Sequence, residues 1–293
     1  MQILITGSSG FIGKNVKEFF ETNGYDVTAP SSRELDCTDE KEVKRFLTEK
    51  YYDYVFHFAV YGDDVDHTKD RTKILEYNLR MFLNFAKCSS CYGKMIYTGS
   101  GAEYDKRFPI CMVSEEDFGK TIPVDQYGLM KYTINQMIEK SSNIYNLRLF
   151  GIFGPYEYWK TRLISNLCCK AIKGIPLSIR RNCVFDYLWV FDFCRMLEKF
   201  IYIEPEFHTY NVVSGSPVDL YSLAETVRII SGKDLDIIVC REGYANEYTA
   251  SNRRILRELD DFQYTKIEDS VRKLYQWYEE RQDSIDTYSL IYG

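Results

Sequence analysis

Three features that would indicate common classes of protein are missing from this sequence. No apolar run approaches the roughly 18–20 residues that a membrane-spanning helix needs. The net charge is −6, whereas nucleic-acid-binding proteins usually carry a surplus of basic residues. A strand-like segment, QILIT, begins at residue 2 and leaves no room for a secretory signal peptide before it. We therefore expect no membrane or nucleic-acid partner, and a cytoplasmic location.

Histidine is also scarce, and this limits the metal sites that the chain can form. There are 9 cysteines and 3 histidines, and the histidines are scattered at positions 57, 67 and 208. Cys88 and Cys91 form a CxxC pair, but a zinc site requires a second pair or nearby histidines at ligand spacing. We interpret the cysteines as reduced thiols and predict no metal site. His57 lies in an apolar segment, so we expect it to be a core residue.

The first half of the chain alternates between short apolar runs and helical patterns. Strands are expected at residues 2–6, 25–29, 54–60, 94–100 and 143–150, and helices at residues 13–23, 39–50, 69–89 and 124–141. This alternation is typical of a parallel sheet with helices on both faces. We predict an α/β fold with a Rossmann-type, doubly wound parallel sheet.

The pattern becomes less regular after residue 153. Helices are expected at residues 163–173, 192–203 and 220–231, and strands at residues 184–190, 210–213 and 235–239. We assign residues 1–153 to the dinucleotide-binding domain and residues 154–293 mainly to a smaller, discontinuous α/β substrate-binding lobe. Residues 184–215 are expected to return to the first domain.

The first strand leads directly into a glycine-rich segment, TGSSGFIG. Gly7, Gly10 and Gly13 are three residues apart at the start of the first expected helix. Glycines there permit a tight turn and let the backbone approach a pyrophosphate, which the N–H groups and partial positive charge of the helix N-terminus attract. The segment therefore predicts a dinucleotide-binding loop that also includes Ser9, Phe11 and Ile12.

The residues after the second expected strand bear on the choice of cofactor. A carboxylate in this position binds the ribose 2′-hydroxyl of NAD, whereas an arginine or small polar residues accommodate the 2′-phosphate of NADP. Here the strand is followed by Pro30, Ser31, Ser32 and Arg33, and the first acid is Glu34. This favours NADP(H), with contacts from the residues at positions 32 and 33, and leaves NAD(H) as the alternative.

A tyrosine and a lysine four residues apart form the candidate catalytic pair. Tyr127 and Lys131 lie in an expected helix, so both side chains leave the same face. An ammonium group near a phenol lowers the pKa of the phenol from about 10, which allows proton exchange near neutral pH. Thr98 and Ser100 end an expected strand, where ligands bind in such sheets. A second Tyr-x-x-x-Lys match, at residues 156–160, falls in an expected loop and is attributed to chance.

These motifs together resemble those of the extended short-chain dehydrogenases/reductases that act on nucleotide sugars, and the resemblance covers nearly the whole chain. TGSSGFIG is similar to the family's glycine motif, and YTGSGAEY and YGLMK are similar to its Ser/Thr and Tyr–Lys segments. LDCTD, FHFAV, EYN and NLRLFGIFGP resemble further segments. The family's pattern implies that the cofactor and catalytic residues in these segments include Asp36, Cys37, Phe58, Ala59, Val60, Asn78, Thr98 and Phe150.

The resemblance implies a role for each catalytic candidate. Tyr127 is expected to be the general acid/base, and Lys131 to lower its pKa and to hold the nicotinamide ribose. Ser100 is expected to hydrogen-bond the substrate oxygen, and Asn78 to anchor a proton-relay water. The implied reaction is hydride exchange between NAD(P) and a carbon of a nucleoside diphosphate sugar, with C4 as the expected carbon. A homodimer is a further expectation from the family.

Departures from the family's motifs narrow this reaction. Sugar-nucleotide 4,6-dehydratases carry Asp-Glu directly after the Ser/Thr, but this chain has Gly101 and Ala102 there, which argues against dehydration. Epimerisation beside the ketone uses a Cys and a His, and these positions fall on Ala102 and near Arg162. A 4-ketosugar reductase is therefore favoured, and a 4-epimerase with retained NAD is the alternative. A non-catalytic NADP-binding regulator is the alternative from another class.

The substrate-binding residues are less sharply indicated. Phe185 stands where many relatives carry an arginine that binds the substrate pyrophosphate. A substrate that contains no nucleotide is therefore an alternative. Arginines 162, 180 and 181 are alternative sources of this charge, unless they are solvated surface residues. We name Ser100, Ala102, Arg162 and Arg181 as candidates. The acidic run at residues 115–117 is expected to be a solvated loop.

Overall fold

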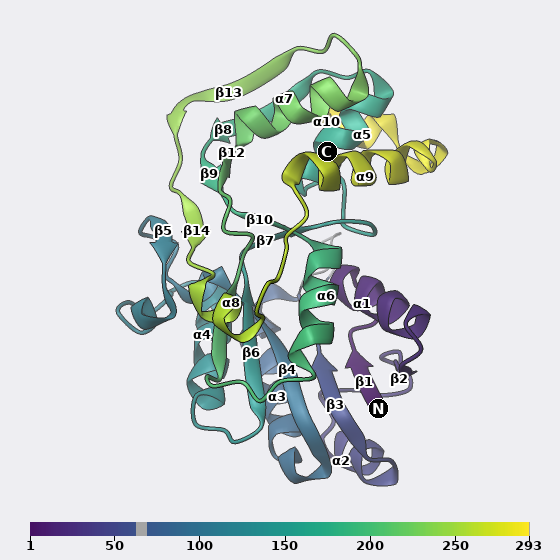
Figure 1. Ribbon diagram of the computed structural model, residues 1–293, viewed down its shortest axis with the longest axis vertical. Coiled ribbons are helices and arrows are strands. Elements are labelled where there is room, and N and C mark those ends of the chain that lie inside the picture. The colour runs from purple at the N-terminus through teal and green to yellow at the C-terminus, as the bar shows by residue number, and fades with distance from the viewer. Residues whose placement is uncertain (63–68, 293) are drawn as a thin grey trace.

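A six-stranded parallel sheet is the main element of the computed structural model, which describes residues 1–62 and 69–292 (Figure 1). Its strands lie in the order β11, β6, β4, β3, β1, β2, and every pairing within it is parallel. The strands span Gln2–Thr6 (β1), Asp26–Thr28 (β2), Tyr52–His57 (β3), Tyr92–Ser100 (β4), Ile144–Leu149 (β6) and Thr209–Val212 (β11). The predicted Rossmann-type fold is confirmed.

Helices cover both faces of this sheet, which explains why its central strands are apolar along their length. Ile3 and Ile5 of β1 point into a core shared with α1, α6 and α8, whereas Leu4 points into a core shared with α2, α3 and α4. These helices span Phe11–Thr22 (α1), Glu40–Glu49 (α2), Ile74–Ala86 (α3), Gln126–Ile138 (α4), Val190–Phe200 (α6) and Arg253–Glu258 (α8).

The strand order places the reversal of the chain between β1 and β3. In sheets of this type, ligands bind in the crevice outside the carboxyl ends of the strands at such a reversal. The glycine-rich loop follows β1 directly, and residues 58–62 follow β3. The fold therefore brings the predicted dinucleotide loop to this crevice.

A second lobe lies on the side of the strands' carboxyl ends, above the main sheet in Figure 1. Its own hydrophobic core joins four helices to a two-stranded parallel sheet. These elements span Leu163–Lys173 (α5), Leu220–Ser231 (α7), Ile267–Glu279 (α9), Thr287–Tyr292 (α10), Leu177–Asn182 (β8) and Ile237–Tyr244 (β13).

Short strands connect the two lobes. One pair is formed by β7 with β10, and a separate sheet has the order β12, β9, β14, β5. They span Ile110–Val113 (β5), Gly151–Phe153 (β7), Val184–Phe185 (β9), Tyr187–Trp189 (β10), Val218–Asp219 (β12) and Tyr248–Ala250 (β14).

The prediction of a single strand at residues 184–190 is wrong, because β9 and β10 belong to different sheets. Asp186 lies between them and is fully buried. Its carboxylate accepts hydrogen bonds of 2.6–2.8 Å from the Ser214 N–H and hydroxyl and from the Gly215 N–H. These bonds tie the segment to the loop after β11 and interrupt the ladder.

The helix predicted at residues 69–89 is shorter than expected. A 3₁₀ turn at Arg71–Lys73, in which Asp70 accepts a hydrogen bond from the Thr72 N–H, precedes α3. His67, one of the three histidines, lies outside the described residues. Over the ranges that the structure does describe, no helix has both the length and the apolarity to cross a membrane.

A fully buried ion pair lies behind the end of β4. Arg148 Nε is 2.8 Å from Glu103 Oε2, and both side chains have no exposed surface. Arg148 Nη1 also donates to the Tyr104 hydroxyl at 2.6 Å and to Asn211 Oδ1 at 2.9 Å. An added Cβ at Gly99 would overlap Glu103 Oε1, so the glycine makes room for this pair.

The acidic run at residues 115–117 is not a solvated loop throughout, as we had predicted. Glu115 is buried, and its carboxylate accepts the Asn211 N–H at 2.7 Å. Burial raises the pKa of Glu115 despite this hydrogen bond. Glu116 is exposed and pairs with Arg254, as expected for a surface carboxylate. The sequence did not reveal that the run packs against β11.

Candidate active site

The three glycines of the first loop differ in how much space each leaves for a side chain. Gly7 has φ +70°, and a Cβ there would lie 2.6 Å from the Ala59 nitrogen. A Cβ at Gly13 would overlap the Gly7 carbonyl oxygen. At Gly10, in contrast, the nearest atom to an added Cβ is 3.4 Å away, and the backbone is extended with φ −81°. The fold itself thus needs Gly7 and Gly13, whereas Gly10 leaves space for a ligand.

The first turn of α1 presents its backbone N–H groups beside this space. Gly10 is the N-cap residue, and no side chain caps the helix. The carbonyl oxygen of Gly10 accepts the Lys14 N–H, which starts the helical ladder and leaves the N–H groups of Phe11 and Ile12 at the end of the helix. Ser9 and Gly10 are exposed. An open cradle at a helix N-terminus fits the pyrophosphate of a dinucleotide.

The turn after β2 ties the Glu34 carboxylate to Ser31. This carboxylate accepts hydrogen bonds of 2.8 Å from the N–H and the hydroxyl of Ser31. Ser32 and Arg33 are exposed, and Arg33 makes no ion pair or hydrogen bond with any residue in the described ranges. This geometry leaves Arg33 available to a phosphate.

The adenine-side candidates are held in a second tight turn. Asp36 Oδ1 accepts the N–H and hydroxyl of Thr38 at 2.8 and 2.7 Å. Cys37 is buried, and burial raises the pKa of its thiol to about 12. Its carbonyl oxygen accepts a hydrogen bond from Asn84 Nδ2 at 2.9 Å.

The end of β3 is fixed by a buried threonine. Thr6 accepts the Ala59 N–H at 3.3 Å and lies 2.9 Å from His57 Nδ1. Burial, followed by the charge of Lys131, lowers the pKa of His57 to about 3, so this residue is a neutral member of the core, as predicted. Phe58 is buried, and Ala59 and Val60 are half-buried beside the glycine loop.

The side chain of Asn78 hydrogen-bonds backbone groups near the same crevice. Its Nδ2 donates to the carbonyl oxygens of Tyr61 and Ile74, at 2.9 and 2.7 Å, and its Oδ1 accepts the Tyr61 N–H at 2.9 Å. The side chain therefore holds the segment after β3 against α3.

Tyr127 and Lys131 leave the same face of α4, above the end of β4. Lys131 is 5% exposed, and its Nζ donates to the Thr98 carbonyl oxygen at 2.6 Å. The same Nζ lies 5.7 Å from the centre of the Tyr127 ring. Gly128 lets the helix approach this strand end, because a Cβ there would lie 2.8 Å from the Ala102 carbonyl oxygen.

Ser100 lies in the turn that α4 approaches. Its hydroxyl accepts the Ala102 N–H at 3.1 Å, and its own N–H donates to the buried Glu103 at 3.0 Å. The structure thus brings the predicted Ser100, Tyr127 and Lys131 to one edge of the sheet, from β4 and α4.

Tyr248 is a site residue that the sequence did not reveal. It comes from β14, and its side chain hydrogen-bonds Ser100. Burial raises the pKa of Tyr248, and the nearby Tyr127 also raises it. A Cβ at Gly101 would lie 2.5 Å from the Tyr248 hydroxyl oxygen, so this glycine admits the phenol. No local motif marks Tyr248 among the chain's 25 tyrosines.

Aromatic rings extend from Tyr248 toward the second lobe. Its ring centre lies 5.0 Å from that of Phe150 and 5.3 Å from that of Phe185. Phe185 in turn stacks on Tyr187 at 5.7 Å. At the position where many relatives carry an arginine, this chain therefore has part of an aromatic wall.

The remaining substrate candidates lie in different surroundings. Ala102 is fully buried. Arg162 is exposed at the N-cap of α5. Burial raises the pKa of both Glu157 and Tyr187, and the nearby charge of Arg162 partly offsets this rise. Arg181 is exposed on β8 opposite Arg241 of β13, and within the described residues it makes no ion pair.

The second Tyr-x-x-x-Lys match does not share the helical geometry. Tyr156 has φ +67° and lies in the loop after β7. Its hydroxyl donates to Glu18 of α1 at 3.1 Å, on the opposite face of the sheet from α4.

The doubly wound sheet with this glycine cradle at its reversal defines a dinucleotide-binding protein. The chain belongs to the NAD dependent epimerase/dehydratase family, whose model matches residues 3–212. This confirms the resemblance to the extended short-chain dehydrogenases/reductases and, with it, a nicotinamide dinucleotide as the class of cofactor.

Individual relatives are distant. The chain is 25% identical to the probable UDP-arabinose 4-epimerase 3 of Arabidopsis thaliana, over 94% of this chain and 80% of that protein. It is 29% identical to the GDP-L-colitose synthase of Yersinia pseudotuberculosis, but over only 36% of this chain and 35% of that protein. Its fold is similar to that of MlghC, the GDP-mannoheptose C4 reductase of Campylobacter jejuni with NADP bound (TM-score 0.80, 18% identity, 95% and 98% of the chains covered).

The steric difference between Gly10 and Gly13 gives a matched pair of variants. Gly10→Ala is expected to leave the free energy of unfolding within about 1 kcal/mol of the parent, because the space and the backbone angles accept a methyl group. It is expected to weaken dinucleotide binding at least tenfold, since the methyl group occupies the cradle. Gly13→Ala is expected to destabilise the protein by more than about 1 kcal/mol, because the methyl group overlaps Gly7.

Urea unfolding and NADPH titration measure the two effects. Normal NADPH affinity in Gly10→Ala would show that the pyrophosphate does not bind in this cradle.

Proposed function

We propose that this protein is an NADP(H)-dependent reductase that reduces the 4-keto group of a nucleoside diphosphate sugar. The observation that carries the proposal is the placement of Tyr127 and Lys131 on α4, above the strand end that carries Ser100. Lys131 is buried against Thr98, within 5.7 Å of the Tyr127 ring centre. A cation so placed stabilises the phenolate that remains when Tyr127 gives up its proton.

In this proposal Ser100, Tyr127 and Lys131 each have a separate role in the reduction of a ketone. Ser100 donates a hydrogen bond to the carbonyl oxygen and orients it. Tyr127 transfers its proton to that oxygen as negative charge develops there. Lys131 stabilises the resulting phenolate and would hold the ribose of a bound dinucleotide. NADPH bound in the crevice would supply the hydride for the carbonyl carbon.

Reduction is favoured over the other reactions of the family by the residues next to Ser100. A dehydratase needs an acid pair at these two positions. At Gly101 the Tyr248 hydroxyl fills the space of a side chain, and Ala102 is fully buried. Arg33 is available to a 2′-phosphate, which suits NADPH as a reductant consumed at each turnover. The similarly folded Campylobacter jejuni protein is a C4 reductase and holds NADP.

A 4-epimerase is the second candidate, favoured by the likeness to the UDP-arabinose 4-epimerase. An epimerase regenerates its cofactor in each cycle and therefore retains it. Denaturing the purified protein separates the two candidates, because release of stoichiometric NAD supports the epimerase, whereas an empty protein that binds NADPH supports the reductase.

Removing the Tyr127 hydroxyl tests the catalytic assignment. Tyr127→Phe is expected to lower turnover of nucleoside diphosphate 4-ketosugars about 10²- to 10⁴-fold, because the general acid is lost, and to leave NADPH affinity unchanged. Consumption of NADPH measures the rate. Tyr156→Phe, in the second Tyr-x-x-x-Lys match, is the control and is expected to keep near-normal turnover. Near-normal turnover in Tyr127→Phe would refute the mechanism, and NADPH binding without any turnover in the parent would favour the non-catalytic regulator.

Arg33 tests the choice of cofactor. Arg33→Ser is expected to weaken NADPH binding about tenfold, because a charge-assisted contact to phosphate is lost, and to leave NADH binding unchanged. Arg45→Ser, which removes an exposed arginine from α2, controls for net charge. Equal loss for both dinucleotides would assign Arg33 no part in recognising the 2′-phosphate.

Tyr248 tests how Ser100 is positioned. Tyr248→Phe keeps the ring and removes the hydrogen bond, so kcat/KM is expected to fall about 2- to 10-fold. Combined with Ser100→Ala it is expected to add almost nothing, since both changes disable one interaction. Tyr244→Phe, at an exposed tyrosine at the end of β13, is the control. Fully additive losses would show that Tyr248 does not act through Ser100.

A further inference from the structure

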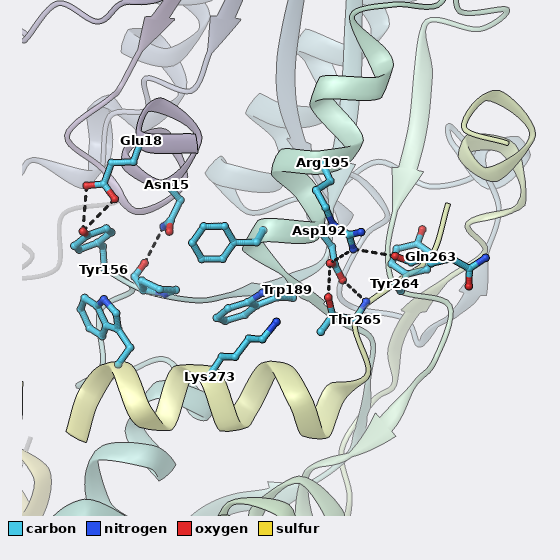
Figure 2. A pocket seen from close by; sticks show the side chains of 13 residues that line it. Asn15, Glu18, Tyr156, Trp189, Asp192, Arg195, Gln263, Tyr264, Thr265 and Lys273 are labelled. Carbon is cyan, nitrogen blue, oxygen red and sulfur yellow. Dashed lines mark hydrogen bonds and ion pairs between the residues drawn. The ribbon is translucent and has the colours of Figure 1, made fainter. Parts of the chain in front are cut away.

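A large cavity lies between the two lobes, away from the candidate active site. It has a volume of about 670 Å³, within the range of small-molecule sites. Figure 2 shows it between α1 and α6 of the main domain and α9 of the second lobe. These helices of the main domain cover the face of the sheet opposite to α4, which carries Tyr127 and Lys131. None of the residues that we assign to catalysis or to the dinucleotide lines it.

Aromatic side chains form much of the wall of this cavity. Five of its lining residues are aromatic: Tyr156, Trp189, Phe191, Tyr264 and Trp277. They come from the loop after β7, from β10 and α6, from the segment between α8 and α9, and from α9 of the second lobe. Such a wall offers flat faces on which a planar ring can stack.

Lys273 is a lining cation without a counter-ion among the described residues. Figure 2 shows its side chain rising from α9 toward Trp189. It forms no ion pair or hydrogen bond with the described residues. Of the other lining charges, Arg195 pairs with Asp192 at 2.6 Å, and Glu18, which is exposed on α1, accepts a hydrogen bond from the Tyr156 hydroxyl. An anionic group beside Lys273 would therefore meet an uncompensated positive charge.

An unsatisfied polar atom lies in the opposite wall. Asn15 is 1% exposed, and its Nδ2 donates to the carbonyl oxygens of Phe11 and Pro155 at 2.9 and 2.8 Å. Its Oδ1 accepts no hydrogen bond from the described chain. A buried acceptor without a donor is costly, and this one belongs to a residue that lines the cavity.

We propose that this cavity is a second binding site, for an organic anion that carries a planar ring. The ring stacks among Trp189, Trp277 and Tyr156, and the anionic group pairs with Lys273. Because the lining comes from both lobes, the ligand touches α1 and α9 together. The site is independent of the reaction proposed above.

The probe for this site is anilinonaphthalene sulfonate, which combines a planar ring system with an anionic group. The chain has 3 tryptophans, and in a Trp159→Phe background the emission comes only from the two that line the cavity. Saturating NADPH is present, so that the dinucleotide site is filled. We expect saturable quenching of this emission by the probe.

Charge variants on α9 locate the anion. Lys273→Gln is expected to raise the Kd of the probe at least threefold, and Lys273→Arg to restore it to within about twofold. Arg272→Gln removes the same charge one residue earlier, outside the cavity, and is expected to leave Kd unchanged. Phenylnaphthylamine, which lacks the sulfonate, is expected to bind the parent and Lys273→Gln equally.

Two outcomes overturn the proposal. Quenching that never saturates would mean that the cavity does not hold the probe. Equal weakening by Lys273→Gln and Arg272→Gln would mean that net charge, and not Lys273, attracts it. Both comparisons remain decisive if NADPH fails to bind, because they depend only on the difference between the α9 variants.

Discussion

The buried ion pair between Glu103 and Arg148 is the interaction on which the candidate active site depends. A buried charge is costly unless it is paired and hydrogen-bonded, and each member of this pair has further partners, although Arg148 Nη2 has none among the described residues. Glu103 accepts the Ser100 N–H, and Arg148 reaches Tyr104 and Asn211. The pair thereby links the carboxyl ends of three neighbouring strands, β4, β6 and β11, to the turn that presents Ser100. Breaking it would leave an unpaired charge beneath the catalytic turn.

Close approach between backbones is the second constraint, and glycine satisfies it at each place where the site is assembled. Gly7 lets the dinucleotide loop pass against Ala59, and Gly128 lets α4 lie against Ala102. Gly101 leaves room for the phenol of Tyr248. The helix that carries Tyr127, the glycine-rich loop and β14 thus reach their neighbours because three side chains are missing at the points of contact.

Local patterns were enough to predict the position of the candidate site residues that depend on short-range geometry. The glycines from Gly7 to Gly13 are three residues apart, and this spacing fits the turn between a strand and a helix. Tyr127 and Lys131 are four residues apart, which places both side chains on one face of a helix. The neutral core role of His57 also followed from its apolar neighbours. The predictions for residues 184–190 and for Glu115 failed, because partners distant in the sequence, Ser214 and Asn211, decide the backbone and the burial there.

The amino-acid sequence by itself determined the alternating fold, the glycine-rich turn and the four-residue spacing of Tyr127 and Lys131, since each arises from contacts between residues that are neighbours along the chain. Only the tertiary structure decided that Tyr248 meets Ser100, that Glu103 meets Arg148, and that Lys273 of α9 lies beside Trp189 of β10 (Figure 2). These contacts join residues that lie far apart in the chain, and no local periodicity encodes them. They depend on how separately formed layers pack, which is set by the shape and volume of all the side chains together.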